Sequence, residues 1–246
     1  MNKLIFVSSL LAVASSAMAW QVSIGIRETA AGGGADVGVG NNGGTAGGIE
    51  WINKDATALI TDGAWHLYTW TLTGATVTAF AGGTANGTLQ GNYGTLENIR
   101  ILNNGGSTNA ISLWIDDVTS SNATGSTNFG SFESYAANAV ARFQRANFSG
   151  SSTNVTAGAT AGVDTSTAHT GVNSYKFNWS HTNNLATNWA RLTSGAGGGM
   201  LDPNSMVRLD NDATISFWAK ATVVPEPATM AVLGLGVAAL IRRRKR

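Results

Sequence analysis

The segment "AISLWIDDV" (Ala110–Val118) decides the fold, because its side chains alternate in character from one residue to the next. Every second residue is aliphatic, namely Ile111, Leu113 and Ile115. The residues between them are polar or aromatic, namely Ser112, Trp114 and Asp116. Successive side chains of a β-strand point to opposite faces, so this pattern predicts a strand with one buried face.

Alternating segments of the same kind recur on both sides of this strand, separated by turn-forming residues. They cover residues 20–27, 63–72, 75–83, 96–104, 171–181 and 213–221. Glycine accounts for 31 of the 246 residues and charged residues for only 12%, which favours strands and turns over helices. Short strands at this spacing are typical of two stacked sheets. We therefore predict an all-β fold, an antiparallel β-sandwich.

The stretch "SSNATGSTN" (Ser120–Asn128) consists of small and polar residues and is typical of a linker. It predicts a first β-rich unit over residues 20–122 and a second one, truncated in comparison, over residues 123–222. Spacing alone leaves two arrangements open. Either the second unit is a small sandwich of its own, or the two halves share one core.

The first 19 residues have the three-part layout of a secretory signal peptide. Lys3 precedes an apolar run over residues 4–14, and small residues follow up to Ala17-Met18-Ala19. An A-x-A sequence of this kind is a signal-peptidase cleavage site. The sequence therefore predicts an N-terminal signal helix over residues 1–19, removed during export by the secretion machinery.

The other end reads "VVPEPATMAVLGLGVAALIRRRKR" (Val223–Arg246). Apart from Thr229, residues 228–241 are apolar or glycine, a run shorter than the roughly 20 residues that span a bilayer core. The basic residues behind them are Arg242, Arg243, Arg244, Lys245 and Arg246. Basic residues stay on the cytoplasmic side of a membrane. We expect a C-terminal hydrophobic helix that pauses export and leaves the body of the chain outside.

This tail resembles the PEP-CTERM sorting signal of Gram-negative bacteria, which is thought to be handled by exosortase, a transpeptidase-like membrane enzyme. The resemblance implies a sorting motif made of Val224, Pro225, Glu226 and Pro227, within a sorting region over residues 223–246. It also implies transient anchoring in the inner membrane, followed by delivery to the cell envelope, the outer surface or the extracellular matrix. The alternative is an ordinary anchor that is never cleaved.

Composition excludes several classes of function. Without Lys3 and residues 242–246, nine basic residues face 14 acidic ones, a net charge of about −5 that argues against nucleic acid as a partner. The absence of cysteine from the sequence excludes disulfides, thiolate nucleophiles and cysteine zinc sites. The histidines (His66, His169 and His181) match no catalytic pattern, and no spacing pairs the glutamates. We therefore predict a protein that is not an enzyme.

Two groups of segments resemble calcium-stabilised jelly-roll carbohydrate-binding modules. "LENIRIL" and "LWIDDV" are similar to the last strands of such a module, and "FESY", "NSYKFNW" and "ISFWAKA" to the early strands. The resemblance implies a jelly-roll-like sandwich that binds polysaccharide. It also implies a structural calcium ion held by Asp116 or Asp117, with Glu133 as the equivalent ligand in the second unit. The alternative for the two aspartates is a solvated strand end.

Trp114 and Trp218 lie opposite the aliphatic residues of their strands and are therefore candidates for stacking on sugar rings. The alternative is that both faces are covered and these residues belong to the core. The sequence thus predicts an exported, non-catalytic protein of the cell envelope or exopolysaccharide matrix that binds polysaccharide. A purely structural surface protein and a polysaccharide-active enzyme fragment remain as alternatives.

Overall fold

The computed structural model describes residues 20–28, 48–194 and 208–224. Twelve strands and no helix lie within these ranges. In chain order the strands are β1 (Gln21–Glu28), β2 (Ile49–Ala58), β3 (Asp62–Thr71), β4 (Val77–Ala81), β5 (Tyr93–Leu102), β6 (Ala110–Asn122), β7 (Gly125–Gly130), β8 (Thr160–Asp164), β9 (Ser174–Trp179), β10 (Trp189–Thr193), β11 (Arg208–Asp210) and β12 (Thr214–Val224). The predicted all-β class is confirmed.

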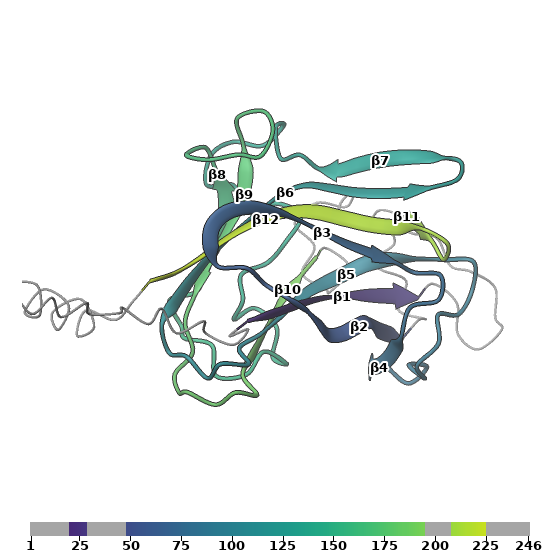
Figure 1. Cartoon of the computed structure of the whole chain (residues 1–246), viewed down its shortest axis with the longest axis horizontal. Coiled ribbons are helices and arrows are strands. Elements are labelled where there is room, and N and C mark those ends of the chain that lie inside the picture. Colours follow the sequence, from purple (N-terminus) through teal and green to yellow (C-terminus); the bar gives the residue numbers. More distant parts are fainter. Residues whose placement is uncertain (1–19, 29–47, 195–207, 225–246) are drawn as a thin grey trace, which may run out of the picture.

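The strands form two antiparallel sheets that lie one above the other (Figure 1). Sheet A has the order β10-β5-β1-β2-β4, with β11 also beside β5. Sheet B has the order β3-β12-β6-β9-β8, with β7 also beside β6. Each sheet takes strands from both sides of the turn-rich stretch 120–128, so the two halves of the chain pair with each other in both sheets.

One hydrophobic cluster fills the space between the sheets. Ile24 of β1 and Ile99 of β5 contribute from sheet A, while Ile115 of β6 and Phe217 of β12 contribute from sheet B. All four side chains are almost completely buried. Residues from both halves of the chain therefore contribute to one hydrophobic cluster in a β-sandwich-like arrangement.

The segment 110–118 behaves as its alternation predicts over the first part of β6. Ile111, Leu113 and Ile115 are buried, whereas Trp114 between them is only half-buried on the outer face. The alternation then breaks, because the pairing of β6 with β12 shifts register near Asp116 and Asp117. Asp117 has a φ of 49°, in the left-handed region, and this marks the bulge.

Segments from both groups that resemble a carbohydrate-binding module lie side by side in sheet B, whereas "LENIRIL" lies in β5 of sheet A and "FESY" lies in a loop. β6, which contains "LWIDDV", is placed between β12, which contains "ISFWAKA", and β9, which contains "SYKFNW". Ile115 of β6 faces Ala219 on one side and Tyr175 on the other. Segments that the sequence analysis assigned to two units therefore contribute to the same sheet.

The two predicted terminal helices lie outside the described residues. They are the signal helix over residues 1–19 and the apolar segment over residues 228–241. In the part of the chain that the structure describes, we find no helix with the length and apolar character needed to span a membrane.

Candidate functional site

A row of alternating tryptophan and lysine side chains crosses the outer face of sheet B, which is the face turned away from the core. Trp65 of β3 pairs with Lys220 of β12, and Lys220 pairs with Trp114 of β6. Trp114 in turn pairs with Lys176 of β9. Paired residues of neighbouring strands project to the same side. We call these four residues the tryptophan–lysine row.

Trp114 is held in place at the middle of this row. Its indole Nε1 donates a hydrogen bond of 2.7 Å to Oδ2 of Asp164. The ammonium of Lys176 lies 4.6 Å from the ring centroid, and that of Lys220 lies 5.4 Å from it. Both distances allow cation–π attraction. The indole is therefore oriented by a carboxylate and flanked by two positive charges.

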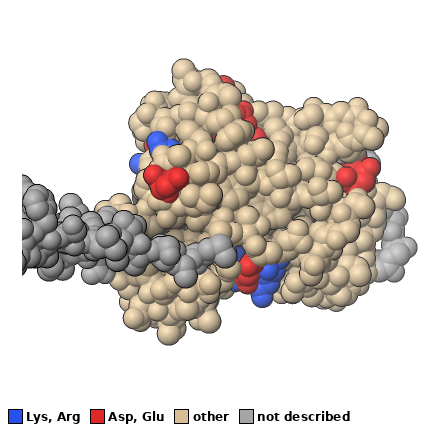
Figure 2. Space-filling model, in the orientation of Figure 1, with Lys and Arg blue, Asp and Glu red and all other residues tan. Residues whose placement is uncertain are grey.

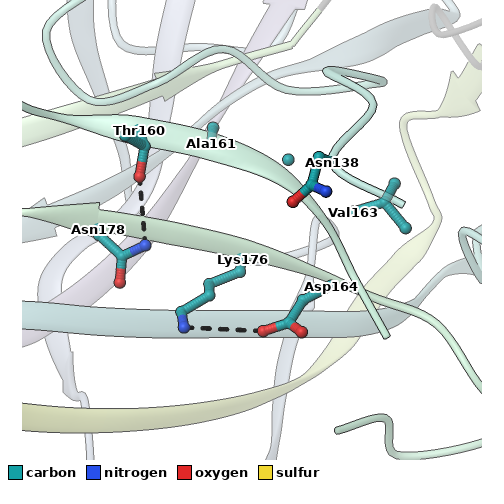
Figure 3. Close-up of a pocket in the computed structure, with 8 residues that line it drawn as sticks. Asn138, Thr160, Ala161, Val163, Asp164, Lys176 and Asn178 are labelled. Atoms are coloured by element: carbon teal, nitrogen blue, oxygen red, sulfur yellow. Dashed lines mark hydrogen bonds and ion pairs between the residues drawn. The ribbon is translucent and has the colours of Figure 1, made fainter. Parts of the chain in front are cut away.

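An open groove with a volume of about 460 Å³ lies along the paired strands β8 and β9 (Figure 3). It is lined by Asn138, Thr160, Ala161, Gly162, Val163, Asp164, Lys176 and Asn178. The amide of Asn178 donates to the hydroxyl of Thr160 at 3.2 Å and accepts from Ser112 at 2.7 Å. Polar groups held by one another in this way can recognise a hydroxylated ligand without first reorganising.

Asp164 is the carboxylate in the groove lining, and both of its oxygens accept hydrogen bonds. Oδ1 accepts a hydrogen bond of 2.8 Å from the backbone N–H of Ser166, and Oδ2 accepts the bond from Trp114. The ammonium of Lys176 lies 3.7 Å from Oδ2. Burial alone would raise the pKa of Asp164, but these hydrogen bonds and the lysine charge together hold it below its usual value.

The other predicted sugar-binding residue, Trp218, is partly covered by a histidine. The imidazole of His169 stacks on its indole with 3.9 Å between ring centroids and 13° between planes. Trp65 meets the same imidazole edge-on, with centroids 6.0 Å apart. One face of Trp218 is therefore occupied within the protein, whereas Trp114 borders the groove through its neighbour Lys176.

Asp116 and Asp117 both bind the segment that contains His169 and Thr170. Oδ2 of Asp116 accepts hydrogen bonds from the backbone N–H groups of His169 (2.8 Å) and Thr170 (3.2 Å). Asp117 lies 2.9 Å from Nδ1 of His169 and accepts from the hydroxyl of Thr170 at 2.9 Å. The bulge in β6 lets two adjacent aspartates reach the same segment. Burial raises the pKa of Asp116 to about 6, despite its hydrogen bonds.

The geometry around these aspartates does not by itself provide a calcium site. Calcium takes about six to eight oxygen ligands, and the described residues hold no group of three or more acidic, histidine or cysteine side chains suited to a metal ion. Glu133, the third predicted ligand, accepts hydrogen bonds from the backbone N–H groups of Val172 and Asn173 at 3.0 and 2.9 Å. Protein donors occupy these carboxylates, so calcium at Asp116 or Asp117 stays a prediction.

Sequence analysis missed an aromatic and arginine cluster on the outer face of sheet A. Trp51 stacks on Phe80 with centroids 4.2 Å apart and meets Trp189 edge-on at 5.3 Å. The guanidinium of Arg100 lies 4.8 Å from the Trp51 ring. Burial lowers the pKa of Arg100 to about 10, and its guanidinium pairs with Asp55. These residues come from four distant strands, so no local pattern groups them.

Two glutamates that no spacing paired also come close together. Glu28 of β1 and Glu50 of β2 are both fully buried. Burial raises the pKa of Glu28 to about 7, a hydrogen bond from the backbone of Gln90 opposes this, and the charge of Glu50 adds to it. Glu50 accepts hydrogen bonds from the backbone N–H groups of Asn86 and Gly87. The pair lies away from the groove, whose lining includes neither residue.

Comparison with known families identifies the end of the chain. Residues 223–246 match the PEP-CTERM protein-sorting motif. The chain carries a PEP-CTERM sorting signal. Such a signal indicates an exported protein that an exosortase-type enzyme sorts through the membrane to the cell envelope. No curated protein and no solved structure matches the chain.

The PEP-CTERM match begins inside the folded body. Its first two residues, Val223 and Val224, are the last of β12 and pair with Ile111 and Ala110 of β6. β12 lies between β3 and β6, so it is an inner strand of sheet B. The sorting region therefore begins within this strand. The motif residues Pro225, Glu226 and Pro227 and the basic tail lie outside the described residues.

Proposed function

We propose that this exported protein is a non-catalytic component of the cell envelope or extracellular matrix that binds polysaccharide on the outer face of sheet B. The observation that carries the proposal is the position of Trp114. Its indole is fixed by Asp164, and the groove that begins beside it is lined by amide, hydroxyl and backbone groups.

This combination matches the chemistry of a sugar. A pyranose ring presents apolar C–H groups on its faces and hydroxyl groups around its edge. An aromatic side chain accommodates the faces, while Asn138, Thr160 and Asn178 offer donors and acceptors to the hydroxyls. The groove is open, so a polymer can lie along it and continue beyond it on both sides.

The groove gives little support to a hydrolytic role. Glycoside hydrolysis uses two carboxyl groups on either side of the scissile bond, about 5–10 Å apart. Asp164 is the single carboxylate among the described lining residues, and its oxygens are engaged by Trp114 and Ser166. This favours binding over turnover, and the enzyme-fragment alternative predicts polysaccharide cleavage instead.

A glycan array with the purified chain tests the proposal. We expect saturable binding to at least one polysaccharide, and we expect Trp114→Ala to weaken it about tenfold or more. Trp218→Ala is the matched control, because Trp218 is also half-buried on this sheet face but stacks on His169, whereas Trp114 contacts the groove residues Asp164 and Lys176. Circular dichroism establishes that both variants fold.

Three outcomes would change the conclusion. Absence of binding by a folded chain would favour the purely structural surface protein. Equal losses of affinity in the two variants would show that the polysaccharide does not bind at the groove. Release of shortened sugars would favour an enzyme. The same array with a chelator tests the predicted calcium ion, since a calcium-supported fold loses binding when calcium is removed.

A further inference from the structure

We infer that the ligand of the groove is an acidic polysaccharide, one that carries carboxylate groups on its sugars. This inference rests on the proposed function and names the class of polymer. It comes from the distribution of positive charge, which differs between the two sheets.

Three basic side chains gather at the groove and its borders. Lys176 lines the groove, and Lys220 lies on the other side of Trp114. Arg145 lines a smaller hollow of about 170 Å³ that shares Thr160 and Ala161 with the groove. The two lysines thus lie on either side of Trp114, and Arg145 lies at the hollow that adjoins the groove at β8.

Two of these cations lack an acidic partner in the described part of the chain. Lys220 donates to the hydroxyl of Thr167 at 3.3 Å, and Arg145 donates to the side-chain amide oxygen of Asn147 at 2.9 Å. Neither takes part in an ion pair there. By contrast, Arg100 and Arg191 of sheet A pair with Asp55 and Glu97. These two arginines of sheet A have carboxylate partners, whereas Lys220 and Arg145 have none among the described residues.

Asp164 offsets one of the three charges, while Asp116 and Asp117 of β6 are engaged by the segment that contains His169 and Thr170. The carboxylate of Asp164 lies 3.7 Å from the ammonium of Lys176, within ion-pair range. Lys220 and Arg145 remain to attract an anion. Figure 2 shows the molecule from the side, in the orientation of Figure 1 with one sheet above the other, and charged side chains are sparse on the face in view. Without Lys3 and residues 242–246, acidic residues outnumber basic ones by about five. Cations without an acidic partner are therefore a distinguishing feature of the groove borders.

The geometry of the row fits a polymer better than a single small anion. Lys220 and Lys176 belong to strands on either side of β6, which places their backbones roughly 10 Å apart. Their ammonium groups lie 5.4 and 4.6 Å from the centroid of the Trp114 ring, so carboxylates on successive sugars can each bind one of them. A chain of sugars with repeated carboxylates can bind both, with an uncharged ring face against Trp114 between them.

The test compares polygalacturonate with the same polymer after methyl esterification, which removes the charge and keeps the backbone. Both are offered to the purified full chain in isothermal titration at low and high salt. We expect at least tenfold weaker binding to the ester, and weaker binding to polygalacturonate as salt screens the charges. Lys220→Gln should weaken polygalacturonate binding about fivefold to tenfold.

Lys54→Gln is the matched control, because Lys54 is an exposed lysine that lies against a tryptophan of sheet A, 4.8 Å from the Trp51 ring. It should leave binding unchanged. Equal affinity for acid and ester, or binding to neutral polymers alone, overturns the acidic class and keeps the proposed function. Acid-selective binding that Lys220→Gln does not affect overturns the groove as its site. Failure to bind polygalacturonate, its methyl ester or any neutral polymer overturns both proposals.

Discussion

The outer faces of the two sheets use the same residue types in opposite ways. On sheet A, Trp51 and Arg100 are 6% and 5% exposed, and each is packed against other aromatic or charged groups. On sheet B, Trp114 and Lys220 are half-buried beside an open groove. Tryptophan and a basic residue thus form a closed cluster on one sheet and an accessible row on the other.

This contrast teaches that residue type does not decide whether an aromatic residue is structural or available to a ligand. The deciding features are burial and the partners of the charge. Glu97, which is fully buried, accepts hydrogen bonds from the guanidinium of Arg191 and also pairs with Arg27, so the arginines of sheet A have carboxylate partners. The lysines beside Trp114 keep excess charge at the surface. The closed cluster should therefore control stability, and the open row should control binding.

The largest expected effect is on the closed face. Trp51→Ala would remove an indole that stacks on Phe80 and supports the guanidinium of Arg100. Burial of a large aromatic side chain is worth about 3–5 kcal/mol by comparable substitutions, so we expect a loss of that size in the free energy of unfolding. Urea denaturation followed by tryptophan fluorescence measures it. A loss below about 1 kcal/mol would contradict a structural role for the cluster.

The carboxylates show the same contrast, and this gives a pH-dependent prediction. Asp164 on the open face has a pKa below its usual value, whereas the pKa of Glu28 on β1 is raised to about 7 by burial. Oε2 of Glu28 has no hydrogen-bond partner among the described residues. Between its ordinary pKa near 4.5 and about 7, the folded state holds a proton that the unfolded state has released. The free energy of unfolding therefore falls as pH rises through this window.

Glu28→Gln should remove this dependence. Glutamine can accept the hydrogen bond from Gln90 through its oxygen, and it is neutral at every pH. From pH 5 to pH 8 we expect the wild-type chain to lose on the order of 3 kcal/mol more than the variant. Denaturant titrations of both chains at the two pH values measure the difference. Parallel pH dependence would show that Glu28 ionises normally in the folded protein.

Local patterns in the sequence predicted the features that depend on local geometry. The alternation of residues 110–118 identified a strand whose aliphatic side is buried, and it placed Trp114 on the outer face. The sorting signal could also be recognised from the sequence, because its parts follow one another within residues 223–246. Each of these inferences needs only neighbouring residues.

Features that depend on pairing between distant strands were beyond this reasoning. The stretch 120–128 reads as a linker, yet it includes the turn between β6 and β7, and strands on both sides of it share two sheets. The Trp51 cluster joins β2, β4, β5 and β10, and the register that brings them together is set by the whole fold. The stacking of His169 on Trp218 was also beyond this reasoning, because His169 lies in a loop whose position depends on the whole fold.

The smallest expected effect on stability belongs to the open face. Trp114→Ala removes a hydrogen bond to Asp164 and the contacts with Lys176 and Lys220, all at a half-buried site. Such contacts contribute about 1 kcal/mol together, since water solvates the freed lysines and carboxylate. Measured beside Trp51→Ala by the same urea titration, Trp114→Ala should therefore lose several-fold less stability while losing most of its affinity for polysaccharide. Equal destabilisation by the two substitutions would mean that Trp114 belongs to the structural framework, and the distinction between a closed and an open face would fail.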